Sequence, residues 1–433
     1  MKKTTRKKII IIGAGIAGLA AYARLIEYGF DAMILEARDR CGGRILTDDT
    51  LGIPLSGGAA WIHGIDNNPI TMLAKRFHAN MAPVNLNKFA TFDRHGQIIS
   101  QNIIQQFNEK FEQLLKQAKK LAYDSKHDIS LATALSTFIE NEKLSPTEQD
   151  LFKRKLMFFE GYIGANYEFL SARHWDQEEI WPGDNCFLTS SYQPIIDGLL
   201  QNCLVKLNTI VTNINTREND IEIVSENTVF YADAVIITVP LGILKKNFIK
   251  FNPPLPIAKE KAIEHLDMGL FNITAIKFPT AFWQKEFQLM FFTQFDDSSI
   301  PTFLNLYHFI QQPILLGYSG GKTARQLENF SDEEIIEKTM QNFKKIYGTE
   351  LPEPESYFTT RWSSDPFSYG SYSYVPAGAS GDDYEAIAKP IANRLFFAGE
   401  ATCSKHPATT HGAYLSGIRE AERIKKIFFD KHF

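Results

Sequence analysis

Lys8-Ile9-Ile10-Ile11-Ile12-Gly13-Ala14-Gly15-Ile16-Ala17-Gly18 is the stretch from which the fold of this chain can be predicted. Its isoleucines form a continuous apolar run, which predicts a buried strand, and helical periodicity follows over residues 13–28. A second apolar run, over residues 32–36, predicts another buried strand. Two buried strands joined by a helix are typical of a parallel βαβ unit, so an α/β fold is expected.

Three glycines, Gly13, Gly15 and Gly18, follow the pattern G-x-G-x-x-G where the first strand meets the helix. The first permits a tight turn, the second lets the backbone approach a pyrophosphate, and the third allows close packing of helix on strand. The helix N-terminus adds N–H donors and positive potential. Glu36 ends the second strand, where a carboxylate can hold ribose hydroxyls. The pattern predicts a dinucleotide without a 2′-phosphate.

The composition limits the class of protein. At 433 residues the chain is long enough for two or three folding units. Its net charge of −4 gives no reason to expect nucleic acid or an anionic membrane as a partner. The basic residues 1–8 lead into a strand without a secretory signal, and no run is long enough to span a membrane. Four scattered cysteines predict no metal site and a reducing, cytoplasmic location: Cys41, Cys186, Cys203 and Cys403.

Helical and strand-rich patterns alternate along the rest of the chain. Residues 101–168 carry amphipathic periodicity, and Ser145-Pro146-Thr147-Glu148 has the signature of a helix start. A last helix is expected over residues 412–428. Further strands are expected at 204–215, 221–225, 231–239, 271–278, 290–294 and 395–398. This order predicts a cofactor domain assembled from separated segments, with a second domain threaded between them.

Six longer strings narrow the cofactor and the chemistry. They are EARDRCGGR (36–44), GGAAWIHG (57–64), ADAVIITVPLG (232–242), GSYSYV (370–375), LFFAGEAT (395–402) and TTHGA (409–413). Together they resemble the FAD-dependent amine oxidases, and among these the polyamine oxidases. The resemblance implies a Rossmann-like FAD-binding domain of the glutathione-reductase type over residues 1–80, 195–255 and 355–433. It also implies an α+β substrate domain with a mixed sheet and helices over residues 81–194 and 256–354.

The resemblance further implies that FAD is the cofactor and that it is held without a covalent bond, since residues 370–375 contain no cysteine. The residues implied in FAD binding are Gly13, Ala14, Gly15, Ile16, Ala17, Gly18, Glu36, Ala37, Arg38, Gly43, Arg44, Gly58, Ala59, Ala60, Trp61, Val211, Trp362, Gly399, Glu400, Thr409, Thr410 and Ala413.

For the chemistry, the resemblance implies His63, Tyr374 and Thr410 as catalytic-site residues. It implies a substrate site lined by His63, Gln177, Glu178, Tyr374 and Ile273. Alternative interpretations stay open: a structural histidine, a sheet tyrosine in an alternating pattern, and a solvated acidic loop around residues 176–179. Gln177, which is not an acid, falls on one of the family's glutamates.

Two departures from the family pattern bear on activity. Ile273 takes the place of the family's lysine, which holds a water near flavin N5. Lys277 does not replace it, because four residues along a strand move a side chain about 13 Å. Ser190 and Ser191 stand where the family usually has a glycine pair. The first change predicts slow reoxidation of the flavin by oxygen, or another electron acceptor.

The expected reaction is oxidation of a small-molecule amine, with spermine, spermidine or an N-acetylated form as the substrate that the resemblance favours. Hydride transfer to flavin N5 is followed by imine hydrolysis, and dioxygen as acceptor gives hydrogen peroxide. One alternative is a monoamine or amino-acid oxidase; the latter needs an arginine for the carboxylate, and Arg173, Arg325 and Arg361 lie in no motif that indicates it. Another is a low-turnover FAD- and ligand-binding paralogue, favoured by Ile273. A chromatin demethylase is not expected, because the chain shows no histone-reader domain.

Overall fold

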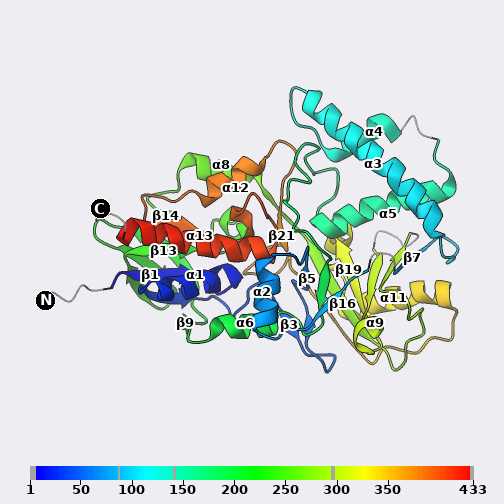
Figure 1. Ribbon diagram of the computed structural model, residues 1–433, viewed down its shortest axis with the longest axis horizontal. Coiled ribbons are helices and arrows are strands. Elements are labelled where there is room, and N and C mark those ends of the chain that lie inside the picture. Colours follow the sequence, from blue (N-terminus) through cyan, green and yellow to red (C-terminus); the bar gives the residue numbers. More distant parts are fainter. Residues whose placement is uncertain (1–5, 86–87, 140–142, 294–297, 430–433) are drawn as a thin grey trace.

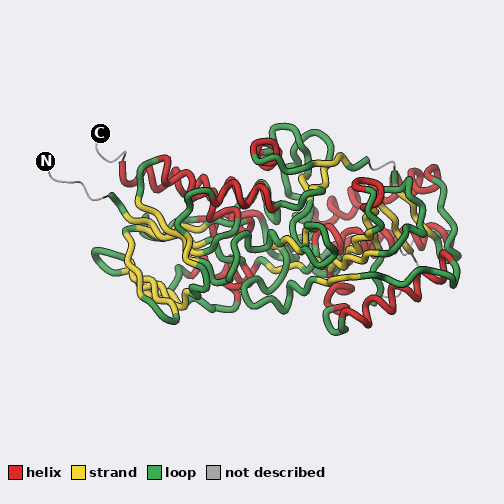
Figure 2. Tube along the Cα trace, turned by 90° about the horizontal axis from the view of Figure 1, so that it is seen from below, coloured by secondary structure: helices red, strands yellow, loops and turns green. Residues whose placement is uncertain are grey.

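The computed structural model describes residues 6–85, 88–139, 143–293 and 298–429. Figure 1 shows an elongated molecule with a parallel sheet toward one end and a larger sheet toward the other. Seen from below, in Figure 2, the same two strand-rich regions are joined by loops and short strands. No helix in the described ranges combines the length and apolar character needed to cross a membrane.

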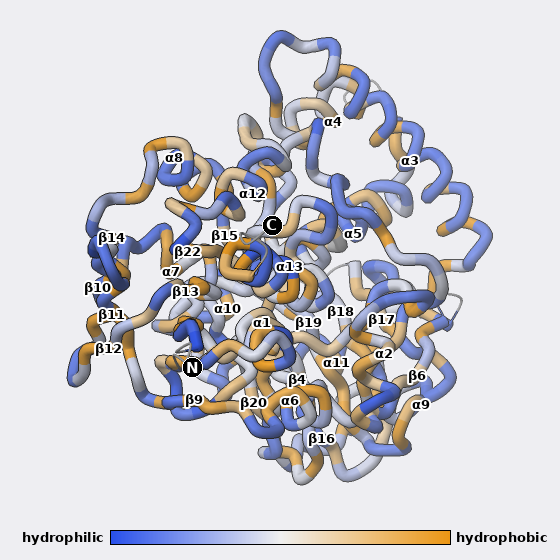
Figure 3. The backbone as a smooth tube through the Cα atoms, turned by 60° about the vertical axis from the view of Figure 1, so that its left-hand side comes forward, coloured by the Kyte–Doolittle hydropathy of each residue, from blue (hydrophilic) through white to orange (hydrophobic). Residues whose placement is uncertain are grey.

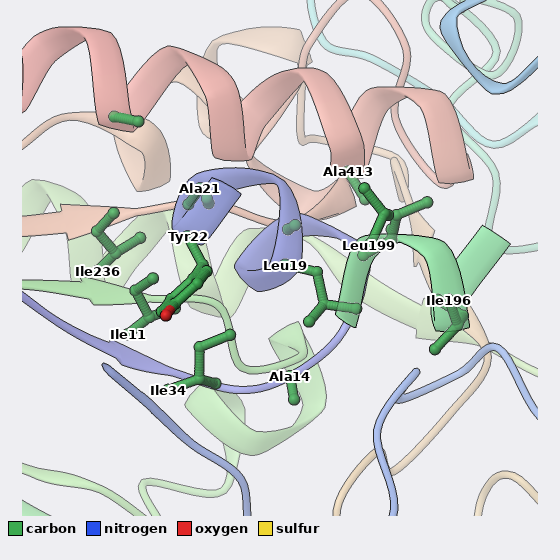
Figure 4. Packing of buried hydrophobic residues seen from close by; sticks show 14 of the residues in the cluster. Ile11, Ala14, Leu19, Ala21, Tyr22, Ile34, Ile196, Leu199, Ile236 and Ala413 are labelled. Atoms are coloured by element: carbon green, nitrogen blue, oxygen red, sulfur yellow. The ribbon is translucent and has the colours of Figure 1, made fainter. Parts of the chain in front are cut away.

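The predicted βαβ unit forms the centre of a five-stranded parallel sheet. The strand order is β22 (Leu395–Phe397), β13 (Ala234–Ile237), β1 (Lys8–Ile12), β2 (Asp31–Leu35) and β9 (Val205–Lys206). Ile9 and Ile11 face a cluster with the helices α1 (Ile16–Glu27) and α13 (Thr410–Phe429), part of which Figure 4 shows. Ile10 and Ile12 face a second sheet. Both faces are therefore covered, which is why this strand is apolar at each of positions 9–12.

The second sheet is four-stranded. Its order is β12 (Val229–Ala232), β11 (Ile221–Ser225), β10 (Val211–Thr216) and β14 (Lys250–Asn252). The predicted strand at 204–215 is split into β9 and β10, because Asn208 adopts a positive φ of 49° and Thr209 donates its N–H to the Glu36 carbonyl. The predicted strand at 231–239 is divided at Asp233, whose carboxylate accepts from the Lys8 N–H at 2.8 Å. Both irregular points attach this sheet to the parallel one.

Two glycines allow the helices to approach the sheet and each other. A Cβ on Gly18 would lie 2.0 Å from the Gly13 carbonyl oxygen, and one on Gly417 would lie 2.1 Å from the Ala17 carbonyl oxygen. Gly13 itself has a φ of 107°, which L side chains rarely adopt. The third glycine of the motif thus fixes the packing of α1, and α13 packs on α1 through a glycine far away in sequence.

The larger sheet is mixed, as predicted for the second domain. Its order is β20 (Ser356–Thr359), β16 (Phe271–Lys277), β19 (Ile314–Gly320), β18 (Thr302–Asn305), β17 (Leu289–Phe292) and β7 (Phe89–Phe92). Only the β17–β7 pair among these is parallel. The strand predicted over 290–294 ends at Phe292, and Gln294 lies outside the described residues.

Helices accompany this sheet. α3 (Gln101–Asp124), α4 (Leu131–Ile139) and α5 (Pro146–Ile163) share one apolar cluster, and α11 (Asp332–Tyr347) packs on the strands in another. The alternation of hydrophilic and hydrophobic positions along α3 can be followed in Figure 3. The helix start at Ser145 is confirmed, since Ser145 and Glu148 form a reciprocal capping box.

Short strands join the two regions. β15 (Asp267–Gly269) pairs with β21 (Tyr372–Tyr374), and β8 (Cys186–Leu188) lies between β5 (Trp61–Ile62) and β6 (Met81–Pro83). We propose the domain division over residues 1–80, 195–255 and 355–433 against 81–194 and 256–354, with one adjustment. Because β20 extends the mixed sheet, the last boundary belongs after Thr359.

Candidate functional site

A cavity of about 880 Å³ runs from the parallel sheet to the mixed sheet. At one end it is lined by Gly13, Glu36 and Thr238, which lie just beyond the carboxyl ends of β1, β2 and β13. At the other end it is lined by Ile273 of β16 and Phe291 of β17. Ligands of open parallel sheets bind outside the carboxyl ends of the strands, so the first end is the expected dinucleotide site.

At this dinucleotide end, Glu36 is buried and is held by backbone amides. One carboxylate oxygen accepts from the Ala14 N–H at 2.6 Å and the other from the Arg38 N–H at 2.9 Å. Arg38 makes a two-pronged ion pair with Asp365, at 2.8 and 2.6 Å. These contacts fix the loop after β2 against the loop before β21, so that two distant segments form one wall.

The next part of the wall is built by Arg44 and Glu400. Arg44 donates to Glu400 at 2.7 Å and to the Ser371 carbonyl at 3.0 Å. The second oxygen of Glu400 accepts from the Ser373 hydroxyl at 2.5 Å and from the Ala408 N–H at 3.1 Å. Three segments of the chain therefore converge on one carboxylate.

The cavity has the shape and donors that a dinucleotide requires. A Cβ on Gly15 would meet no atom within 4 Å, so its backbone faces open space where a pyrophosphate would lie. A Cβ on Gly58 would lie 2.0 Å from the Arg44 carbonyl oxygen. Only a glycine therefore lets the backbone at residue 58 pack this closely against the backbone at Arg44. The residues present therefore fit FAD.

Almost all the residues predicted for FAD binding line the cavity. The exceptions are Ala14, which is fully buried beside the sheet, and Gly18, which packs on Gly13. Their part is to hold the turn, with the Ala14 N–H orienting Glu36. Those that line the cavity are Gly13, Gly15, Ile16, Ala17, Glu36, Ala37, Arg38, Gly43, Arg44, Gly58, Ala59, Ala60, Trp61, Val211, Trp362, Gly399, Glu400, Thr409, Thr410 and Ala413.

Thr410 begins helix α13, and its hydroxyl lies 3.0 Å from that of Tyr192. Tyr192 donates its only hydroxyl proton to the Trp61 carbonyl at 2.7 Å, so Thr410 is the donor to Tyr192. This chain of hydrogen bonds fixes the start of α13 relative to the loop that carries Trp61 and His63. The Trp61 and His63 rings lie parallel, with centroids 6.3 Å apart.

The predicted acid Glu178 lies beside Tyr162 and His411, and the centroid of the predicted His63 ring lies 5.9 Å from that of the Tyr162 ring. Glu178 accepts from the Tyr162 hydroxyl at 3.2 Å, and its other oxygen is 4.0 Å from Nε2 of His411. Burial raises the pKa of Glu178, although the Tyr162 hydrogen bond opposes this. Burial lowers the pKa of His63 and takes that of His411 to about 3, with the neighbouring histidines adding to the second shift. Both imidazoles are therefore neutral near pH 7.

The other predicted substrate residues also line the cavity. Tyr374 donates to Asp267 at 3.2 Å, Gln177 has a buried Nε2 without a hydrogen-bond partner in the described structure, and Ile273 is 1% exposed. Ser190 and Ser191 do not line it: Ser191 is fully buried in the left-handed region, with φ 58°.

Several charged residues weighed from the sequence lie elsewhere. Asp176 pairs with Lys119 at 2.6 Å, and Glu179 pairs with Lys405 at 3.3 Å. The arginines considered for a carboxylate are also outside the cavity lining: Arg173, Arg325 and Arg361. Arg173, for example, donates to the Ala122 and Ser125 carbonyls, at 2.7 and 2.5 Å.

Sequence reasoning missed part of the lining. Arg154, Lys155 and Tyr162 come from helix α5 and lie in no motif, because the amphipathic pattern of that helix indicates only its buried face. Tyr318 lies on β19 opposite Ile273, which only the strand pairing reveals. His411 could have been predicted as a lining residue, because it lies within the string TTHGA.

Comparison with known proteins identifies the family. The flavin containing amine oxidoreductase family matches residues 16–425. The chain is 35% identical to polyamine oxidase 4 of Oryza sativa subsp. japonica over 433 residues, which cover 96% of this chain and 88% of the relative. It is also 35% identical to lysine-specific histone demethylase 1 homolog 2 of Arabidopsis thaliana, over 97% of this chain and 58% of that protein.

The fold recurs in a solved structure, a putrescine oxidase double mutant made to redesign cofactor binding. The TM-score is 0.79 at 19% identity, and the match covers 97% of this chain and 99% of the other. This likeness accords with the Rossmann-like domain and the mixed-sheet domain described above. The chain therefore belongs to the flavin-containing amine oxidoreductases and is an FAD-dependent amine oxidase.

Proposed function

We propose that the enzyme oxidises a long aliphatic amine of the polyamine class, such as spermine, spermidine or an N-acetylated form. The observation that carries the proposal is the cavity, which joins the dinucleotide end at Glu36 to a channel containing His63, Glu178 and Tyr374. Because the cavity reaches from the parallel sheet to the mixed sheet, it offers an extended amine room beyond the dinucleotide end. Relatives that are named polyamine oxidases and that match 96% or more of the chain support the same substrate class.

FAD, when bound, accepts a hydride equivalent from the carbon beside the amine nitrogen. The chain's side chains bind and orient the amine. His63 is neutral and half-buried, so it can accept a hydrogen bond without placing a positive charge beside the amine. Glu178 offers a carboxylate to a substrate ammonium, and Tyr374 forms part of the apolar wall that excludes water.

We assign the FAD-binding role to the cavity-lining residues of the dinucleotide end, with Glu36 at the ribose and the Arg44–Glu400 pair in the adjoining wall. Dioxygen is the proposed acceptor, giving hydrogen peroxide. One observation favours slow turnover with oxygen: Ile273 is an apolar side chain, 1% exposed, at the position where the family has its lysine. A cytoplasmic location is part of the same proposal.

Anaerobic mixing with spermine, spermidine, N-acetylspermine and a monoamine tests this function. We expect one of the polyamines to bleach the flavin absorbance and the monoamine to do so more slowly. Oxygenated buffer added afterwards measures reoxidation. A flavin that dithionite reduces but that no polyamine reduces would overturn the proposal.

A further inference from the structure

The end of the cavity farthest from the dinucleotide motif lies between helix α5 and one face of the mixed sheet, whose relative positions Figure 1 shows. Strand pairing aligns one row of cavity-lining residues across four strands of this sheet: Ile273, Tyr318, Thr302 and Phe291. Three strand spacings separate the ends of the row, so it spans about 14 Å. The row runs from Ile273, one of the predicted substrate residues, to Phe291 at the far end of the cavity.

Arg154 of α5 stands at the far end of this row. Its guanidinium carbon lies 4.3 Å from the centroid of the Phe291 ring and 5.5 Å from that of Phe89. Its Nε is buried without a hydrogen-bond partner, and within the described residues no carboxylate pairs with it. Burial lowers the pKa of Arg154 to about 10, so the group remains charged at neutral pH.

Arg154 is half-buried and its Nε is enclosed. A guanidinium without an anion is costly in such a place, and stacking on an aromatic ring does not satisfy its N–H groups. The rest of the far end adds positive charge. Lys155 also lines the cavity, and its pKa is lowered by burial and then by Arg154, with Glu112 opposing. The acids that line the described cavity are Glu36, Glu178 and Glu400, and the first and last belong to the dinucleotide end.

We propose that Arg154, with Lys155 beside it, forms a carboxylate-binding subsite, and that the preferred substrate is a long aliphatic amine with a carboxylate at the end opposite the oxidised C–N bond. The inference rests on the amine oxidation of the proposed function and goes beyond its polyamine substrates: a long amine that ends in a carboxylate should bind more tightly than one, a polyamine included, that ends in an ammonium. A guanidinium edge matches the two oxygens of a carboxylate. A terminal ammonium at this end would be repelled by two cations.

The distance excludes an α-amino acid as the occupant of this subsite, because its carboxylate is attached to the carbon beside the nitrogen. An extended polypeptide advances about 3.3 Å per residue, and each residue has three backbone bonds. A distance of about 14 Å therefore corresponds to about four residues, or to a chain of about twelve bonds. The matching ligand is therefore an amine and a carboxylate separated by a long chain.

Three probes of equal length test the subsite: aminododecanoic acid, dodecylamine and diaminododecane. They share an amine at one end and carry a carboxylate, a methyl group or an ammonium at the other. Isothermal titration calorimetry on the FAD-loaded enzyme gives their affinities, and anaerobic bleaching of the flavin gives their reactivity. We expect the carboxylate probe to bind about 10- to 100-fold more tightly than dodecylamine, and the diamine most weakly.

Arg154→Gln should abolish the preference for the carboxylate, and Arg154→Lys should retain part of it. Lys153→Gln is the matched control, because Lys153 is the exposed neighbour on the same helix and does not line the cavity. If the Arg154→Gln protein does not bind FAD, the order of the three probe affinities in the unmodified enzyme tests the subsite. Equal or tighter binding of the diamine would overturn the subsite, as would an unchanged preference in Arg154→Gln. Failure of every amine, polyamines included, to bleach the flavin would instead overturn the proposed function.

Discussion

Arg44 donates a hydrogen bond to Glu400 at 2.7 Å across 356 positions of sequence. The pair joins the loop after the first βαβ unit to the short 3₁₀ turn before α13, and both residues line the dinucleotide end of the cavity. Side-chain exposures of 23% and 6% make it a partly buried pair, in which the loss of one partner leaves a charge poorly solvated.

Glu400→Gln should therefore weaken both FAD retention and the fold. Loss of a charge-assisted hydrogen bond predicts a decrease of about 1.5–3 kcal/mol in the free energy of unfolding. The flavin-to-protein absorbance ratio after gel filtration and the Tm with and without added FAD would measure this. Glu27→Gln, which removes a surface pair with Arg24, is the control and should change neither value. Wild-type FAD content in Glu400→Gln would contradict the assignment.

Gly18→Ala tests the close packing of the first helix. The added Cβ would lie 2.0 Å from the Gly13 carbonyl oxygen, so α1 must move away from the turn. We expect a loss of about 3 kcal/mol in stability and a purified protein with little bound FAD. Chemical denaturation and the absorbance ratio measure the two effects. Full FAD content in the Gly18→Ala protein would show that the turn tolerates the shift.

Ile273→Lys should speed reoxidation of the substrate-reduced enzyme by oxygen, because it restores the side chain that the family places at this position. We expect a gain of about tenfold or more, together with some loss of stability from burying an amine. Stopped-flow mixing of the reduced enzyme with oxygenated buffer gives the rate. Lys277→Met, on the same strand but outside the cavity lining, should leave it unchanged. Rapid reoxidation of the unmodified enzyme would contradict the hypothesis.

Glu178 predicts a pH dependence of substrate binding. Because burial raises its pKa, the carboxyl becomes neutral at a higher pH than an ordinary glutamate, and KM for a cationic amine should rise as the pH falls through that value. The stability of the fold depends on pH in the opposite direction. Glu178 contributes stability when the pH is below the ordinary pKa of a glutamate, and this contribution is lost as the pH rises through its raised pKa in the folded protein.

In the Glu178→Gln variant, KM should no longer rise at low pH. At higher pH, where Glu178 of the wild type is charged, the KM of the variant should be about tenfold higher than that of the wild type. Glu179→Gln, the adjacent acid that pairs with Lys405 outside the cavity, should keep the wild-type profile. Steady-state KM measured from pH 5 to pH 8 gives the comparison. Coincident profiles for wild type and Glu178→Gln would remove Glu178 from the substrate site.

Much of the dinucleotide end could be predicted from sequence because its determinants are local. Gly13, Gly15 and Glu36 act through backbone geometry within one βαβ unit, and the structure places all three on the cavity wall. Element boundaries were less predictable. The strand expected over 204–215 is interrupted because Thr209 bonds to the loop after β2, a partner that its own neighbourhood does not reveal.

The family and the cofactor could be inferred from sequence because six strings resemble those of the FAD-dependent amine oxidases. The α/β architecture could be inferred because a nucleotide turn, a helix cap and an apolar strand are each specified by a few adjacent residues. In the substrate channel, the family resemblance implied five residues: His63, Gln177, Glu178, Tyr374 and Ile273. The further lining residues Arg154, Lys155, Tyr162 and Tyr318 became known only from the folded chain. Arg154 belongs to an amphipathic helix and looks like any other surface position until α5 packs on the mixed sheet and brings it over Phe291. Such a contact depends on how elements far apart in the chain are arranged, and no local pattern encodes it.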